Sequence, residues 1–260
     1  MSKRIKIEMM TIFKTLLNKE IKRFLKVSTQ TVTAPVMMSL LYMLIFGNAL
    51  NDYVQVYAGI SYTAFLVPGL VMMTLLQNTF ANSSSSLIQA KINGSIVFML
   101  LSPASPIQIY LAYMLAAISR GFIVGIGVFV VTSLFITPSV YSLLWILFFG
   151  FVGAGLLGTM GIIAGIWAER YEQLSTFQNF LITPATFLSG VFYSIHSLPQ
   201  FWQYVSEFNP FFYLVDGFRY GFFGCSDVNP WVSLMIVSIF FCFFAVFTLH
   251  LLQKGYKLRF

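Results

Sequence analysis

The sequence predicts an all-α integral membrane protein that forms one membrane domain over residues 1–260. We expect six transmembrane helices, an N-terminal amphipathic interfacial helix and a re-entrant helical hairpin before the last span. Hydrophobic residues make up 58% of the chain and charged residues 9%, whereas a soluble domain carries about 25% charge. The apolar residues also form runs of roughly 20 residues, which is the length that crosses a hydrocarbon core of about 30 Å.

Residues 1–26 are predicted to form a basic amphipathic helix. Lys14, Asn18, Lys22 and Lys26 share one helical stripe. Since an apolar span follows directly, this pattern favours a helix that lies along the membrane surface. An ordinary soluble helix packed on a partner is the alternative. The apolar residues recur at helical spacing on another stripe: Ile5, Met9, Ile12, Phe13, Leu16, Leu17, Ile21, Phe24 and Leu25.

Six apolar segments follow, separated by polar residues, glycines and prolines. The segment 82–106 begins with a run of serines and closes with Pro103 and Pro106, so it is predicted to be a loop on the same side as the N-terminus. The aromatic but mixed segment 194–229 is predicted to dip into the outer leaflet as short helices. The six predicted spans cover about 31–50, 59–81, 107–136, 142–167, 174–193 and 231–252.

The basic residues predict the orientation. With the N-terminus inside, thirteen of the 15 Lys and Arg residues lie on the cytoplasmic side, and Arg219 lies outside. Basic residues are retained on the cytoplasmic side, so both termini are predicted to be cytoplasmic. The net charge of +7 is then a matter of topology, and no nucleic-acid partner is expected.

The motifs exclude several chemistries. The stretch 153–158 matches G-x-G-x-x-G, but it lies inside an apolar span without a preceding strand, so a nucleotide site is not predicted. No phosphate-loop motif, catalytic residue or metal site is found, and the chain is not expected to be an enzyme. Small residues four apart instead predict close helix packing in the third and fourth spans: Gly121/Gly125, Ala154/Gly158 and Gly161/Gly165.

Polar residues inside spans are the candidate pathway residues. Arg120 lies near the centre of the third span, where an ionised arginine costs at least about 2.5 kcal/mol. It either faces a cavity or polar partner, or extends to an interface. Gln178, Asn179 and Thr183 make the fifth span polar, and Pro184 frees a backbone carbonyl. These side chains either line a pathway or join neighbouring helices through buried amides.

Two stretches resemble the ABC-2 type transporter permeases, and the similarity covers nearly the whole chain. One is Gly94-Ser95-Ile96 with the later Leu100-Leu101-Ser102-Pro103-Ala104-Ser105-Pro106. The other is more specific and begins with Leu188-Ser189-Gly190-Val191-Phe192-Tyr193. It continues through Leu198-Pro199 and Asn209-Pro210 to Asp216-Gly217-Phe218-Arg219-Tyr220-Gly221.

The resemblance implies the permease subunit of an exporter in the bacterial inner membrane. Two copies of the chain would bind two copies of a separate ABC ATPase, which would hold ATP and Mg²⁺, and this chain would bind no cofactor. The cargo would be amphiphilic or lipid-like. The sequence departs from the family at Val97 and Phe98, where acidic or polar residues are common. The alternatives are an ion-coupled secondary transporter, for which the spans lack acidic residues, and a structural membrane subunit.

The resemblance also assigns roles to individual residues. The N-terminal helix and the loop near Gly94 would contact the ATPase, and the re-entrant segment would form an outer gate. The expected ATPase-coupling residues are Gln89, Lys91, Ile92, Asn93 and Gly94, and the expected gate residues are Asn209, Pro210, Asp216 and Arg219.

Overall fold

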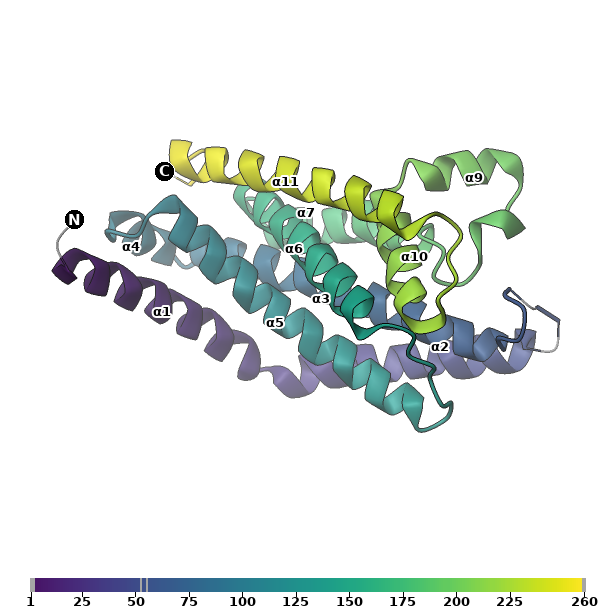
Figure 1. Cartoon of the computed structure of the whole chain (residues 1–260). Helices are drawn as coiled ribbons and strands as arrows, with labels where there is room; N and C mark the ends of the chain where they lie inside the picture. The colour runs from purple at the N-terminus through teal and green to yellow at the C-terminus, as the bar shows by residue number, and fades with distance from the viewer. Residues whose placement is uncertain (1–2, 52, 55, 259–260) are drawn as a thin grey trace.

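The computed structural model describes residues 3–51, 53–54 and 56–258, with the side chains of α1 described from residue 10 onward. Within these residues the fold is helical and contains no strand, in agreement with the predicted class. Most long helices run lengthwise through an elongated bundle (Figure 1). In the part of the chain that the structure describes, five helices are long and apolar enough to cross a membrane. The first is Thr29–Leu50, in which the π turn η1 (Thr29–Thr33) continues into α2 (Ala34–Leu50). The others are α3 (Tyr62–Ile92), α5 (Pro106–Ser133), α6 (Leu143–Trp167) and α11 (Pro230–Lys254).

The segment predicted as the fifth span, 174–193, is a shorter helix in three pieces. These are α7 (Tyr171–Phe177), the π turn η2 (Gln178–Ile182) and α8 (Thr183–Phe187). The Thr183 N–H donates to the carbonyl of Gln178, five residues back. Pro184 has no N–H to continue the regular ladder, which accounts for a widened turn just before it. The helix ends at Phe187, so a sixth crossing stays a prediction.

Helix α3 is the central element, and it corrects the predicted loop. The polar residues 82–92, expected outside the membrane as a loop, continue this helix to Ile92. They remain helical because serine hydroxyls bond to carbonyls of the preceding turn: Ser84 Oγ donates to Phe80 O at 2.8 Å and Ser83 Oγ to Thr79 O at 3.3 Å. A helix of 31 residues is about 46 Å long and extends beyond the hydrocarbon core.

The predicted small-residue contacts are present, and they pack both α5 and α6 against α3. A Cβ added at Gly121 would lie 2.1 Å from Thr79 Oγ1. One added at Gly161 would lie 2.6 Å from the backbone oxygen of Phe80. Only glycine permits this approach of the backbones, as in other closely packed membrane helices.

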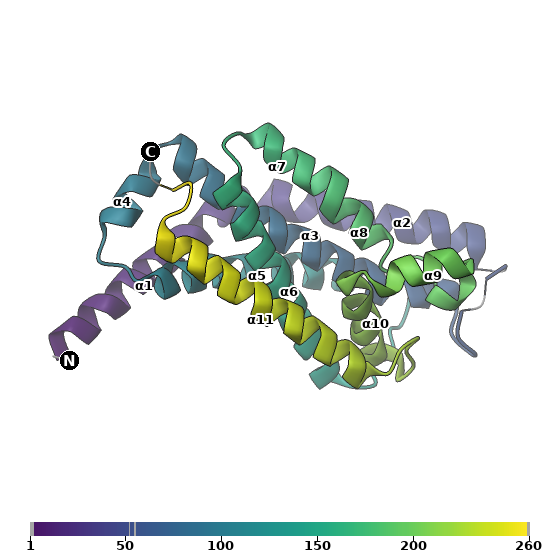
Figure 2. The ribbon, with the colours of Figure 1, turned by 90° about the horizontal axis from the view of Figure 1, so that it is seen from above.

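Helices α1 (Lys3–Leu25) and α4 (Ser95–Leu101) lie at the end of the bundle that also holds both chain ends (Figures 1 and 2). Helix α1 packs against α5, and its C-terminal end points towards α2 (Figure 1). The predicted basic stripe, Lys14 to Lys26, is exposed, whereas Leu16 is half-buried and Phe24 buried. Leu25 is exposed, unlike the residues of the apolar stripe from Ile12 to Phe24, and Ile5 and Met9 lie outside the described side chains. The placement of α1 at a membrane surface stays a prediction.

The predicted re-entrant segment forms the opposite end of the molecule. It contains the turn η3 (Ile195–Ser197), α9 (Gln200–Glu207) and α10 (Pro210–Phe223). Helix α10 packs against α3, α6 and α11, and Gly224 ends it in the left-handed conformation with φ 69°. Two short helices before the last span are therefore present, while their depth in the membrane stays a prediction.

Candidate functional site

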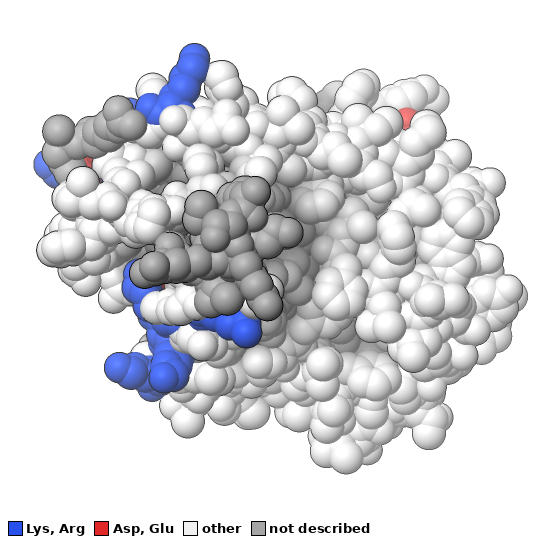
Figure 3. All heavy atoms as spheres, turned by 60° about the vertical axis from the view of Figure 1, so that its left-hand side comes forward, with Lys and Arg blue, Asp and Glu red and all other residues white. Residues whose placement is uncertain are grey.

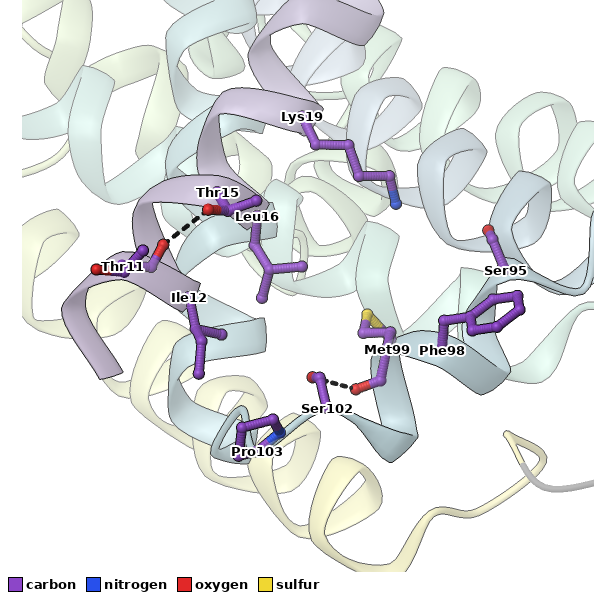
Figure 4. A pocket seen from close by; sticks show the side chains of 10 residues that line it. All are labelled: Thr11, Ile12, Thr15, Leu16, Lys19, Ser95, Phe98, Met99, Ser102 and Pro103. Carbon is purple, nitrogen blue, oxygen red and sulfur yellow. Dashed lines mark hydrogen bonds between the residues drawn. The ribbon is translucent and has the colours of Figure 1, made fainter. Parts of the chain in front are cut away.

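A groove lies between α1 and α4 at the end that carries both termini (Figure 4). Its volume is about 710 Å³. Thr15 Oγ1 bonds to Thr11 O at 2.8 Å and Ser102 Oγ to Met99 O at 2.7 Å, so each hydroxyl is satisfied by its own turn. The surface left to a partner is therefore mainly apolar. Its lining residues are Thr11, Ile12, Thr15, Leu16, Lys19, Ser95, Phe98, Met99, Ser102 and Pro103.

The last turn of α3 and the two residues that follow it expose four of the five expected coupling residues: Gln89, Ile92, Asn93 and Gly94. Gly94 has φ 68°, a conformation that side chains disfavour, and it allows α4 to begin at Ser95 directly after α3. Phe98, on the first turns of α4, is 77% exposed. An aromatic ring this exposed beside an apolar groove is typical of a surface that contacts either another protein or the membrane.

The fifth expected coupling residue, Lys91, is not at this surface. Its side chain is 6% exposed, and Nζ donates to Ile166 O at 2.8 Å and also to Ala168 O. These carbonyls belong to the C-terminal turn of α6, where a cation offsets the negative end of the helix dipole. Lys91 therefore joins α3 to α6 within this chain.

A second cavity of about 360 Å³ lies at mid-length, between α2, α3 and α8. We call it the membrane cleft. Polar side chains bridge its walls: Ser39 Oγ and Thr74 Oγ1 are 2.9 Å apart, and Gln77 Nε2 donates to Thr186 Oγ1 at 2.9 Å. It is lined by Ala34, Pro35, Met38, Ser39, Tyr42, Met73, Thr74, Gln77, Asn78, Thr183 and Phe187.

The predicted pathway residues differ in their position relative to this cleft. Thr183 lines it, whereas Gln178 does not, and Asn179 is exposed on the outward face of the η2 turn. Arg120 Nη2 donates to Asn78 Oδ1 at 3.2 Å, so the guanidinium contacts a residue of the cleft wall. Arg120 Nε is buried and has no hydrogen-bond partner among the described residues. The geometry matches the alternative in which Arg120 has a polar partner inside the bundle.

Asn78 belongs to a polar stripe on α3 that the sequence analysis did not identify. The stripe has four residues, four positions apart: Thr74, Asn78, Asn82 and Ser86. Arg23 Nη2 of α1 donates to Asn82 O at 2.8 Å and to Asn82 Oδ1 at 2.9 Å. Ser86 Oγ donates to the buried carboxylate of Glu20. The spacing of four along an apolar helix was the signal that could have revealed it.

The predicted gate residues connect the loops at the end of the molecule opposite the termini. Arg219 is 1% exposed, donates from Nη2 to Gly190 O at 2.7 Å and lies 3.8 Å above the ring of Phe65. Asn209 Nδ2 donates to Ala185 O at 2.6 Å, and its Oδ1 caps α10 just before Pro210. The segment predicted to form the gate is therefore joined to α3 and to α8.

Two carboxylates, Asp216 and Asp227, complete this hydrogen-bond network. Asp216 accepts the backbone N–H groups of Asp227 at 2.8 Å and Val228 at 3.1 Å. Burial raises the pKa of Asp216 to about 6, although both N–H groups favour the ionised form. Asp227, which was not predicted, accepts from Tyr57 Oη and Ser194 Oγ, each at 2.8 Å. Burial also raises the pKa of Tyr57.

Comparisons with known proteins match most of the chain to one family. The family description "ABC-2 type transporter" covers residues 11–223. The inner membrane transport permease YadH of Escherichia coli K12 is 36% identical over 246 residues, which are 95% of this chain and 96% of that protein. Nodulation protein J of Rhizobium leguminosarum bv. trifolii is 26% identical over 208 residues, 79% of each chain.

Proposed function

The chain belongs to the ABC-2 type transporter family, and on that premise we propose that it is the permease subunit of an ATP-driven exporter. Its apolar helices and its similarity to an inner membrane transport permease make it a multi-pass inner-membrane protein. We propose that a separate ABC ATPase binds and hydrolyses the ATP. Transport is then outward, and both termini are cytoplasmic.

The groove between α1 and α4 is the observation that carries this proposal. It is open and mainly apolar, it lies at the end with both termini, and the exposed ring of Phe98 stands beside it. A helix of the ATPase that laid its apolar face in the groove would bury this surface. Ile92, Asn93 and Gly94 adjoin it and would form the rest of the contact.

The membrane cleft is the candidate pathway. We propose that two copies of the chain pair through the faces of α2 and α7–α8. Asn179 is exposed there, and a polar amide facing lipid would be costly. Met38 and Phe187 line the cleft beside Gln77 and Thr183. A mixed lining of this kind suits an amphiphilic or lipid-like cargo, whose polar part would meet the amides while its apolar part remained near lipid.

The gate proposal rests on Arg219, Asp216 and Asn209, which connect the segment before the last span to the outer ends of α3 and α8. ATP-driven closure of the ATPase would move α4 and α1 as a rigid body, and the cleft would change its access from one side to the other. An ion-coupled transporter would need a carboxylate at the cleft, and no Asp or Glu is among its lining residues in the described part of the chain.

Purification of the tagged chain from its native membrane in mild detergent tests the proposal. Mass spectrometry should find an ABC ATPase at equal stoichiometry, and the complex should hydrolyse ATP. A control purification of the chain carrying Phe98→Ser should recover less ATPase at the same permease yield. An intact, folded permease that is reproducibly free of any ATPase would contradict the proposal and favour a structural or ion-driven role.

A further inference from the structure

Another pocket, distinct from the membrane cleft, adjoins the groove on the side of α1 that faces the C-terminal part of α3. It has a volume of about 590 Å³ and shares Lys19 and Ser95 with the groove. We call it the cationic pocket. Four of its lining side chains carry positive charge, and no Asp or Glu is among its described lining residues. The lining residues are Lys19, Lys22, Arg23, Lys26, Val27, Ser86, Gln89, Ala90, Asn93 and Ser95.

Two of the four cations have partners inside the protein. Arg23 donates to Asn82 and, from Nε, to Glu20 Oε2 at 3.3 Å. Lys19 Nζ lies 3.5 Å from Glu20 Oε1. The carboxylate of Glu20 is 1% exposed and faces Ser86, so it offers no further compensation to the pocket.

The other two cations, Lys22 and Lys26, are exposed. Among the described residues, the ammonium group of neither lysine forms a hydrogen bond or an ion pair. Lys26 follows the last residue of α1, and its backbone N–H donates to Lys22 O at 3.2 Å, so the two lysines lie one helical turn apart and project in a similar direction. The opposite wall supplies neutral polar side chains, Gln89 and Asn93. Figure 3 shows the Lys and Arg atoms gathered on one side of this end of the molecule, next to a broad uncharged surface.

The position of the cationic pocket relative to the first apolar span indicates the depth in the membrane at which its ligand lies. Residues 27–51, directly after Lys26, contain no charged side chain and form the first apolar span. Lys22 and Lys26 therefore lie where the hydrocarbon of the bilayer ends and the headgroups begin. A cationic site at that level meets the negative surface of the cytoplasmic leaflet, to which each nearby lysine is attracted by about 1 kcal/mol.

We propose that the cationic pocket binds the phosphate headgroup of an anionic phospholipid of the inner leaflet. Lys22 and Lys26 bind the phosphate oxygens, while Gln89 and Asn93 bind the remaining polar headgroup atoms. The acyl chains extend into the surrounding bilayer. The site is separate from the cleft proposed for cargo, and it places a lipid beside the groove proposed for the ATPase.

Native mass spectrometry of the permease in a neutral detergent tests the site without any ATPase or cargo. Dioctanoyl phosphatidylglycerol should bind more tightly than dioctanoyl phosphatidylcholine. The double variant Lys22→Gln/Lys26→Gln should bind phosphatidylglycerol roughly thirty-fold more weakly, from about 1 kcal/mol per lysine, with its phosphatidylcholine binding unchanged. The control Lys14→Gln/Lys254→Gln removes two exposed charges outside the pocket and should retain the wild-type preference.

Equal phosphatidylglycerol affinity in the wild type and in Lys22→Gln/Lys26→Gln would overturn the assignment. Displacement of the lipid by an equal concentration of soluble glycerol phosphate would also overturn it, because the ligand would then be a free anion. If the double variant does not fold, Lys26→Gln alone should weaken phosphatidylglycerol binding about fivefold. An unchanged affinity in that variant would likewise contradict the site.

Discussion

Replacement of Phe98 by serine should weaken ATPase binding without destabilising the permease. Complete burial of a phenylalanine side chain contributes about 1.5–3 kcal/mol. Phe98 is 77% exposed in the isolated chain, so the ATPase can still bury about three quarters of that surface, worth roughly 1.2–2.3 kcal/mol. The Phe98→Ser variant should therefore bind the ATPase roughly 7- to 45-fold more weakly. Its melting temperature should match the wild type, because little of the ring is buried in the free permease.

The assay is a titration of the co-purified ATPase onto permease in lipid nanodiscs, with melting of each variant in parallel. Leu134→Ser is the matched control, since Leu134 is 79% exposed at the far end of α5. It removes a comparable apolar surface and should leave ATPase affinity unchanged. If Phe98→Ser binds as tightly as Leu134→Ser, the ATPase does not bury Phe98, and the assignment of the groove is wrong.

Three further predictions concern other contacts. Lys91→Met removes the cation that caps α6, and melting in detergent should show a loss of about 2 kcal/mol relative to Lys254→Met; equal melting would show that the cap contributes nothing. Gly161→Ala should destabilise by about 1–3 kcal/mol because its Cβ would meet Phe80 O at 2.6 Å, whereas Gly125→Ala, whose nearest contact is 3.4 Å, should be neutral or slightly stabilising; similar losses in both would contradict the packing argument. In a Cys225→Ala/Cys242→Ala background, Phe208→Cys should react with an impermeant thiol reagent on intact cells and Ile92→Cys only after permeabilisation; the reverse pattern would invert the topology.

Local sequence properties predicted the parts of the fold that depend on composition. Long apolar runs identified the five membrane-length helices, because lipid permits little else to cross it. The limits of these helices were less predictable. The serines at 83–85 were expected in a loop, yet their hydroxyls bond to carbonyls of their own helix and so allow these polar residues to stay within it. Pro184 was noted, but the widened turn before it depends on backbone geometry that the sequence does not specify.

The sequence predicted which types of residue form the candidate sites, but not which way their side chains point or which helices they contact. Lys91 was expected to face the ATPase, and its partners are carbonyls of Ile166 and Ala168, more than 70 positions away. Gly121 and Gly161 indicated close approach, but a glycine does not specify which helix approaches. Asp227 resembled an ordinary loop residue and connects three loops only through the tertiary fold. Contacts between residues this far apart in the sequence leave no signal in its local periodicity.

Helix α3 connects the three regions to which functions are assigned. Its C-terminal end leads into α4 and the groove, its middle supplies Gln77 and Asn78 to the membrane cleft, and Phe65 near its start lies under Arg219. Lys91 fixes it to α6 and Asn82 fixes it to α1. A displacement at the groove would therefore move α1, α3, α4 and α6 together.

The helices on the other side of the cleft, α2 and α8, each follow a π turn. The π turn η1 ends one residue before Ala34-Pro35, and η2 ends one residue before Thr183-Pro184. Pro35 and Thr183 both line the cleft. Widened turns next to proline interrupt the regular hydrogen-bond ladder, and helices bend at such points. Helix α3 has an interruption of its own at Pro68, but its cleft-lining residues all follow that proline and belong to the part that is tied to α1 and α6. The cleft should therefore change its width by bending at η1 and η2, which precede α2 and α8, against the part of α3 that follows Pro68.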